Sequence, residues 1–191
     1  MRRPNRTRAS PILVQSAGKW SLQAASAASD LFMLPSRRTP RLPGFDYARP
    51  GVYFVSTCTH RRRCVLGRVV DGNVYLSRVG TIVEEEWLLT AERRPYVMLD
   101  SYVIMPNHVH GLIVIQERLR DEPAGRRQRS LSSIVGAFKA AASRRVGAIT
   151  GQQGRMLWQR SYHEPVVRDY RELGRIRDYI AANPARWATH A

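Results

Sequence analysis

Two strand-like runs separated by a single proline constrain the fold of this chain more than any other feature of its sequence. Residues 97–105 and 107–115 are both rich in β-branched and apolar side chains, and Pro106 stands between them. Their proximity predicts an antiparallel hairpin. The second run is apolar at most of its positions, which is typical of a central strand of a sheet.

Further segments predict extended chain and helices. β-branched and aromatic residues mark a strand over 51–59, Asp71-Gly72 marks a turn before a short strand at 74–76, and residues 158–167 also read as extended. Residues 77–93 predict a helix, because their apolar residues recur at four-residue spacing. The apolar face of a second helix consists of Leu131, Ile134, Val135, Phe138 and Ala142.

The last helix has both a start signal and a stop signal. Asp169 followed three residues later by Glu172 resembles a capping box, and we expect the helix to stop at Asn183-Pro184 because proline cannot continue it. Together the elements predict an α+β fold, an antiparallel sheet with helices packed on its faces. Residues 1–42 are expected to be a basic, disordered extension, and residues 43–191 to form the domain.

Composition narrows the class of partner. The 191 residues include 31 Lys and Arg against 15 Asp and Glu, a net charge of +16, and all of the basic residues except Lys19 and Lys139 are arginine. The planar guanidinium of arginine forms paired hydrogen bonds with phosphate and stacks on nucleic-acid bases, so a polyanion is the expected partner. Codon bias in a GC-rich genome explains arginine over lysine equally well, but it does not explain the excess over acids.

The same composition bears on location. No apolar run approaches the ~18 to 20 residues that a membrane span requires, so we expect no membrane partner. Cys58 and Cys64 form no CxxC motif and suit a reducing compartment, which predicts a cytoplasmic protein.

The sharpest chemical signal is His108-Val109-His110. Side chains of a strand alternate between its faces, so both imidazoles leave the same face about 7 Å apart along the backbone, close enough to bind one cation. Two nitrogen ligands leave a metal site incomplete. From the spacing alone, a pair of histidines satisfied by hydrogen bonds on a half-buried strand is an equally good interpretation.

A second signal is the pair Tyr179 and Asn183 in the last helix. Residues four apart share a helix face, and these two border the stripe of Leu173, Ile176 and Ile180 that should pack on the sheet. Taken alone, the pair favours a structural interpretation, because a tyrosine at such a boundary commonly edges the core and an asparagine before proline commonly ends a helix.

The two signals together, in their sequence context, resemble a known family. The chain contains, in order, RLPGFDYARPGVYFVSTCTHRRR, MPNHVHGLI, WQRSYHEPVVRDYRELGRIRDYI and YIAANP. This ordered set resembles the single-tyrosine HUH transposases of the IS200/IS605 type, in particular the REP-associated tyrosine transposases. The resemblance covers residues 41–187.

The resemblance implies a ferredoxin-like or RRM-like fold with a C-terminal catalytic helix, and a transposase that cleaves and rejoins single-stranded DNA with hairpin or repeat features. Residues 43–191 would then be the IS200-like catalytic domain. Tyr179 would be the nucleophile that forms a 5′-phosphotyrosine, and His108, His110 and Asn183 would bind Mg²⁺ or Mn²⁺. General chemistry agrees, because a phenol is a weak nucleophile and a cation on the phosphate stabilises the charge that develops.

Two details accompany this resemblance. Tyr162 and Tyr170 are rival nucleophiles, but neither is followed four residues later by an asparagine. Pro165 stands where the family commonly has histidine. Proline has no backbone N–H to donate to a neighbouring strand, so its segment should be an edge strand or a bulge. This departure from the family affects the DNA contacts expected near Pro165.

DNA binding is expected to depend on arginines, with Tyr53, Trp87, Trp158 or Tyr162 as candidate stacking platforms. For Trp87 its helix face favours the core over stacking. Affinity should fall steeply with salt. The arginines are Arg61, Arg62, Arg63, Arg126, Arg127, Arg129, Arg144 and Arg145.

Other interpretations stay open at this point. The chain could be a non-catalytic, host-adopted protein that binds repeats or hairpins, or an RNA-binding protein on an RRM-like sheet, although it lacks an RNP-type aromatic signature. Monomer and homodimer are both open, and so is whether Tyr179 serves the histidines of its own chain. The distance between the Tyr179 hydroxyl and the histidine pair within one chain bears on that question.

Overall fold

The computed structural model describes residues 46–117 and 130–187. Its main sheet has four antiparallel strands in the order β4 (Val97–Ile104), β5 (His108–Ile115), β1 (Gly51–Cys58) and β6 (Val166–Val167). The hairpin β4–β5 and the central place of β5 are as predicted. β6 lies at an edge of the sheet, as Pro165 predicted.

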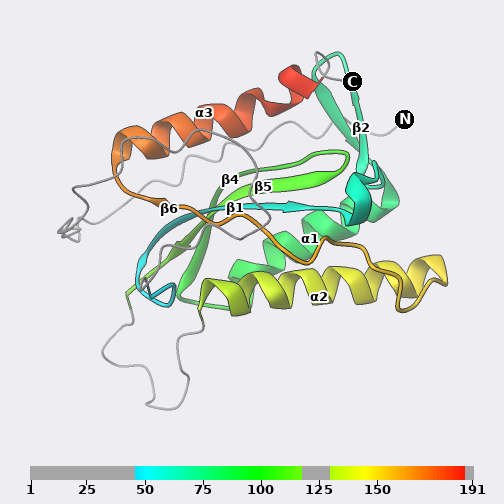
Figure 1. Cartoon of the computed structure of the whole chain (residues 1–191), viewed down its shortest axis with the longest axis horizontal. Helices are drawn as coiled ribbons and strands as arrows, with labels where there is room; N and C mark the ends of the chain where they lie inside the picture. The colour runs from blue at the N-terminus through cyan, green and yellow to red at the C-terminus, as the bar shows by residue number, and fades with distance from the viewer. Residues whose placement is uncertain (1–45, 118–129, 188–191) are drawn as a thin grey trace.

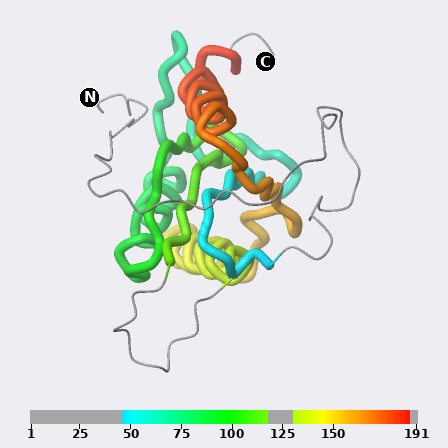
Figure 2. The backbone as a smooth tube through the Cα atoms, turned by 90° about the vertical axis from the view of Figure 1, so that its left-hand side faces the viewer, coloured from blue at the N-terminus to red at the C-terminus, as the bar shows by residue number. Residues whose placement is uncertain are grey.

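Helices cover both faces of this sheet. Figure 1 shows α1 (Arg78–Glu92) and α2 (Leu131–Thr150) on one face and α3 (Tyr170–Trp187) on the other, and Figure 2 shows the same three layers from the side. A separate hairpin of β2 (Gly67–Val70) and β3 (Asn73–Leu76) precedes α1. Without that hairpin and α3, the order of strands and helices is the β-α-β-β-α-β of ferredoxin-like folds, which confirms the predicted α+β class.

Helix starts follow their capping residues. The hydroxyl of Ser77 accepts a hydrogen bond from the backbone N–H of Gly80 at 3.0 Å and begins α1. At α3 the carboxylate of Asp169 accepts from the N–H of Glu172, and the Glu172 carboxylate accepts from the N–H of Arg168, both at 2.7 Å. The start signal identified in the sequence is therefore correct.

The predicted end of α3 is wrong. The helix continues through Pro184 as far as Trp187. Pro184 removes only one donor near the C-terminal end, and its ring is buried, while Trp187 packs against the apolar cluster on this side of the sheet. The burial of these apolar side chains offsets the free-energy cost of the helix hydrogen bond that Pro184 cannot donate.

β5 separates two apolar clusters. On the α1–α2 side, Ile113 is fully buried in the larger cluster, whereas Leu112 on the α3 side packs with Ile180. At Gly111 the Trp87 ring of α1 packs directly against the strand, because a Cβ there would lie only 2.3 Å from a ring carbon of Trp87. A side chain at this position would push the helix away from the sheet.

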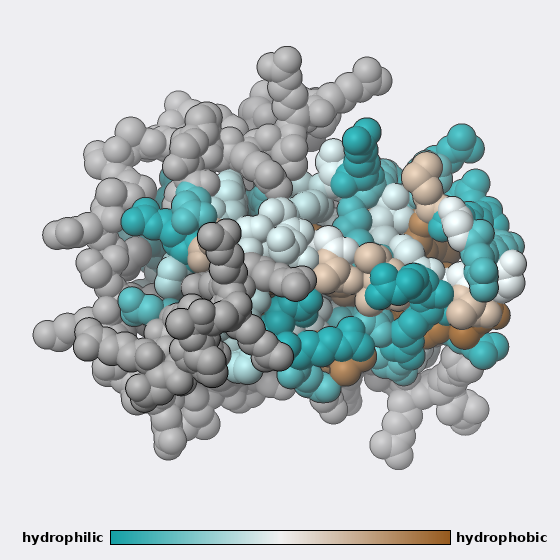
Figure 3. All heavy atoms as spheres, turned by 90° about the horizontal axis from the view of Figure 1, so that it is seen from below, coloured by the Kyte–Doolittle hydropathy of each residue, from teal (hydrophilic) through white to brown (hydrophobic). Residues whose placement is uncertain are grey.

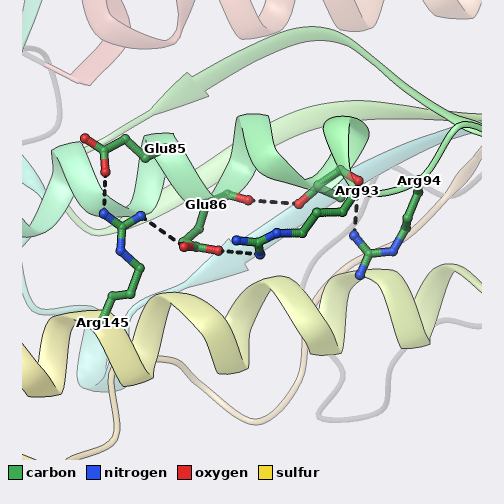
Figure 4. Close-up of polar contacts among 6 residues, drawn as sticks. Glu85, Glu86, Arg93, Arg94 and Arg145 are labelled. Carbon is green, nitrogen blue, oxygen red and sulfur yellow. Dashed lines mark hydrogen bonds and ion pairs between the residues drawn. The ribbon is translucent and has the colours of Figure 1, made fainter.

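Ion pairs join α1 to α2. The buried carboxylate of Glu86 binds Arg93 and Arg145, each at 3.0 Å, and Arg145 also binds Glu85 at 2.6 Å (Figure 4).

Figure 3 shows the surface of the molecule from below the view of Figure 1. On this face the described residues are a mixture of hydrophilic residues and scattered apolar ones. None of the helices in residues 46–117 and 130–187 has both the length and the apolar character that crossing a bilayer requires.

Candidate active site

The two histidines lie together on the sheet face beneath α3. His108 is the first residue of β5 and pairs with Cys58 of β1, and His110 pairs with Ser56. Their ring centroids are 4.4 Å apart. The strand alternation therefore brings both imidazoles to one side, as the sequence predicted, where each can reach the same small ligand.

Tyr179 meets this pair from α3. Its hydroxyl lies 3.3 Å from Nε2 of His110, within hydrogen-bond distance. Phe54 of β1 stacks on the His110 ring at 5.3 Å between centroids and presents its edge to the Tyr179 ring at 6.2 Å. The tyrosine is 36 % exposed, so its side chain is held by these neighbours and yet remains partly open to solvent.

Asn183 lies one turn further along α3, beside the other histidine. It is buried, and its side chain hydrogen-bonds to His108. The ring of Trp187 packs 5.9 Å from the His108 ring. Tyr179 thus contacts His110 while Asn183 contacts His108, and all four side chains belong to one chain.

Both imidazoles are neutral at physiological pH. The pKa of His108 is lowered to about 4, mainly by burial. The hydrogen bond to Asn183 raises this pKa, and the nearby Arg62 guanidinium lowers it. Burial also holds the pKa of His110 well below 6.5, assisted by the neighbouring His108 and His163. Neutral imidazoles keep a lone pair, and a lone pair is what a metal ion needs.

Asn107 orients the first histidine. Its side-chain oxygen lies 2.7 Å from Nδ1 of His108. An amide oxygen can only accept, so Nδ1 carries the proton and Nε2 keeps its lone pair. Metal-binding histidines are commonly held in this way by an outer partner. The sequence analysis missed Asn107, although its place directly before the histidines was a signal.

The donor set fits a divalent cation held with modest affinity. Among residues 46–117 and 130–187, no three His, Cys, Asp or Glu side chains lie close enough to hold a metal ion. Two neutral imidazoles with the amide oxygen of Asn183 could hold a divalent cation, and such a set would suit Mn²⁺ at least as well as Mg²⁺. Nδ1 of His110 is buried without a hydrogen-bond partner among the described residues, so its own orientation comes from ring packing.

Three of the predicted arginines follow the strand end that pairs with His108, and Arg62 acts electrostatically on His108. Arg61 and Arg62 belong to the short 3-10 helix η1 (His60–Arg62), which follows β1 at the end that pairs with His108, and Arg63 comes directly after it. All three side chains are exposed. Arg61 and Arg62 have φ of 56° and 52°, a left-handed conformation that non-glycine residues rarely adopt.

The other predicted arginines lie elsewhere. Arg144 is exposed on α2, and Arg145 is bound to Glu85 and Glu86, so both belong to the layer on the opposite side of the sheet (Figure 1). Arg126, Arg127 and Arg129 fall outside the described residues.

The proposed stacking platforms are mostly wrong. Tyr53 and Trp87 are fully buried and Trp158 nearly so, because β1 and α1 direct them into the core. Tyr162 is half-buried, with the Lys139 ammonium 5.8 Å from its ring centre. Of the rival nucleophiles, Tyr170 is 72 % exposed in the first turn of α3.

Two more residues at the site were missed. The guanidinium of Arg186 lies 5.8 Å above the Tyr179 ring, seven residues further along α3. His163 pairs with Ser56, which in turn faces His110. A helical wheel could have indicated Arg186, whereas His163 approaches only through the pairing of segments far apart in sequence.

Comparisons with known proteins bear on the fold and the family of the chain. The sequence matches no family model. It is 31 % identical over 163 residues to an uncharacterized protein of Haemophilus influenzae, covering 79 % of this chain and 89 % of that protein. A solved structure of a REP-associated tyrosine transposase bound to a REP hairpin superposes with a TM-score of 0.53 at 19 % identity, over 81 % of this chain and 74 % of that one.

A second solved structure, of a candidate transposase from Deinococcus radiodurans, has a TM-score of 0.44 at 20 % identity and covers 74 % of this chain and 95 % of that one. That similarity is too low to support an argument. The extent and identity of the sequence match place the chain in the same family as the Haemophilus influenzae protein, with the fold of a REP-associated tyrosine transposase.

Proposed function

We propose that this protein is a metal-dependent DNA transposase that cleaves and rejoins single-stranded DNA through a covalent 5′-phosphotyrosine at Tyr179. The observation that carries the proposal is the 3.3 Å separation between the Tyr179 hydroxyl and Nε2 of His110, with His108 and Asn183 directly beside them. A phenol, two neutral imidazoles and an amide at one place in a strongly basic protein suit attack on a phosphodiester.

The chain's own groups have distinct tasks in this reaction. His108, His110 and Asn183 would hold Mg²⁺ or Mn²⁺, which when bound supplies positive charge to the phosphate. The Tyr179 oxygen forms a bond to phosphorus, the bond from phosphorus to the 3′ oxygen breaks, and the phenol proton is released as the 3′ oxygen gains one. One phosphodiester replaces another, so rejoining follows by reversal without an external energy source.

Substrate class follows from charge and from the related structure. Arg61, Arg62 and Arg63 are exposed at the strand end that pairs with His108 and would bind phosphates near the cleaved one. The transposase with the similar fold was solved with a REP hairpin, and we extend that class of ligand, single-stranded DNA with a hairpin, to this chain. The sheet face that an RRM-like protein would offer to RNA is covered by α3, which disfavours the RNA-binding alternative.

Trapping of the covalent intermediate tests the proposal. Wild-type protein incubated with single-stranded hairpin DNA and Mn²⁺ should give an adduct that resists denaturing electrophoresis, and Tyr179→Phe should give none while binding the same DNA. Tyr170→Phe is the matched control, because it removes an exposed hydroxyl of the same helix. His108→Ala, His110→Ala and chelator should each abolish cleavage.

Other outcomes point elsewhere. An adduct that survives Tyr179→Phe would refute the assignment of the nucleophile, and cleavage that survives both histidine variants and chelator would refute the metal site. Tight DNA binding without any adduct under Mg²⁺ or Mn²⁺ would support the host-adopted binding protein instead.

A further inference from the structure

The apolar contact between α3 and the sheet leaves the roll of this helix poorly fixed. Leu173, Ile176 and Ile180 form one stripe that faces the sheet, and Ile180 is fully buried. Apolar contacts have no preferred direction, so a small rotation of α3 about its own axis would cost little in burial. The same rotation would move the Tyr179 hydroxyl away from His110.

Arg177 and Tyr179 lie on opposite flanks of that stripe. A helix turns by about 100° per residue, so these side chains point roughly 160° apart, with the apolar stripe between them. When α3 rolls, one of them approaches the sheet and the other leaves it. A directional bond at Arg177 therefore helps to fix the position of Tyr179, together with the hydrogen bond of Asn183 to His108 on the same helix.

A bulge in β4 provides the partner for that bond. The register of β4 and β5 shifts between Leu99 and Tyr102, so Asp100 and Ser101 together oppose the single residue Leu112. Such an extra residue re-aims side chains. Oδ1 of Asp100 accepts hydrogen bonds from the backbone N–H of Ser101 at 2.6 Å and from its hydroxyl at 3.1 Å, which fixes the carboxylate on its own strand.

The Asp100 carboxylate binds the Arg177 guanidinium through two hydrogen bonds. Nε of Arg177 donates to Oδ1 at 3.0 Å, and Nη2 donates to Oδ2 at 2.6 Å. Partial burial raises the pKa of Asp100, but the bonds from Arg177 and Ser101 outweigh it and lower the pKa below its ordinary value. Two parallel bonds between a guanidinium and a carboxylate set the angle of a side chain as well as its distance.

We propose that Asp100 and Arg177 are positioning residues that fix the roll of α3 and thereby hold the Tyr179 hydroxyl at His110. The proposal rests on the function proposed for Tyr179 and adds to it a pair that touches neither the histidines nor the phosphate. If the ion pair were merely structural, its removal would change the free energy of unfolding only slightly, because the side chain of Arg177 is 47 % exposed. The contact between Tyr179 and His110 would then stay unchanged.

The test uses the full chain with two variants, Arg177→Lys and Arg177→Ala. Arg177→Lys keeps the positive charge but cannot form two parallel hydrogen bonds to the Asp100 carboxylate. The matched control is Arg93→Lys, an exposed guanidinium bound to a buried carboxylate of α1 on the other side of the sheet. The first measurement is the nitrogen NMR shift of the His110 ring without DNA or metal, with Tyr179→Phe as the reference for a lost hydrogen bond.

We expect both Arg177 variants to move the His110 signal toward that reference, while Arg93→Lys leaves it in place. The rate of adduct formation should fall by roughly tenfold or more in the Arg177 variants at unchanged DNA affinity, because a small misplacement of a reacting group is costly. A His110 signal that stays at the wild-type position in both Arg177 variants overturns the proposal. A signal that moves in a protein that never forms an adduct supports the positioning pair and refutes the transposase function.

Discussion

The hydroxyl of Tyr179 and Nε2 of His110 lie 3.3 Å apart, within hydrogen-bond distance of each other. The proposed nucleophile and one of the proposed metal ligands are therefore in contact before any substrate arrives. This contact holds the phenol in place, and it also occupies an atom that a cation would use.

Removal of the phenol should therefore strengthen metal binding in the absence of DNA. A hydrogen bond of this kind contributes about 0.5 to 1.5 kcal/mol, so Tyr179→Phe should bind Mn²⁺ roughly two- to tenfold more tightly than the wild type. Titration followed by Mn²⁺ electron paramagnetic resonance measures this directly. Equal affinity in the two proteins would mean that the ion does not use Nε2 of His110.

Stability should decrease on the acid side because of the buried histidines. In the unfolded chain an imidazole takes a proton near pH 6.5, whereas the pKa of folded His108 is about 4. Between these values the unfolded state binds more protons, so the free energy of unfolding falls as the pH falls, by at most about 3 kcal/mol from His108. Urea unfolding at pH 7 and at pH 5 should show the loss, and His108→Ala should show a smaller one.

Arg62 should contribute to DNA binding through phosphate charge. For single strands, each neutralised phosphate adds about 0.7 to the slope of log affinity against log salt concentration, so Arg62→Ala should flatten the slope by roughly that amount. Arg144→Ala is the comparison, because Arg144 is equally exposed but lies on the opposite layer. A similar loss of slope in Arg144→Ala would show that the DNA also follows α2.

Arg145 should affect folding more than DNA binding. Its guanidinium bridges Glu85 and the buried Glu86, and Arg145→Ala leaves the Glu86 carboxylate with fewer donors. The free energy of unfolding should fall by about 1 kcal/mol, because a buried charge with an incomplete set of partners is costly. Chemical denaturation at neutral pH measures this, and a stability equal to that of the wild type would contradict it.

Gly111→Ala should destabilise the protein even though it adds only a methyl group. The new Cβ would meet the ring of Trp87 at 2.3 Å, and overpacking of this kind costs roughly 1 to 3 kcal/mol. Trp87→Phe in the same chain should recover part of the loss if the clash is the cause. A double variant no more stable than the sum of its single changes would exclude that explanation.

The parts of the site that could be predicted from sequence are those set by local periodicity. His108 and His110 share a face because a strand alternates, and Tyr179 and Asn183 share a face because a helix repeats nearly every four residues. Both pairs are fixed within five residues, so distant segments could not change them.

The rest depends on contacts between distant segments. Asp100 and Arg177 are brought together by a bulge whose sequence signal is weak, and the role of Arg145 depends on two acids of another helix. The continuation of α3 through Pro184 follows from burial, which outweighs the local preference that predicted a stop there. Charge counts identify a basic protein, but they do not say which arginines are already paired.

The close approach at Gly111 has a consequence for protein engineering. The tripeptide His108-Val109-His110 could be grafted onto a strand of an unrelated scaffold, and the rings would still emerge from one side. The scaffold would lack the indole of Trp87 that packs against the strand immediately after the second ring. We expect the two rings to be less well fixed relative to each other there. A transplant that retains chelating strength must therefore carry the glycine and an aromatic counterpart from the layer behind it.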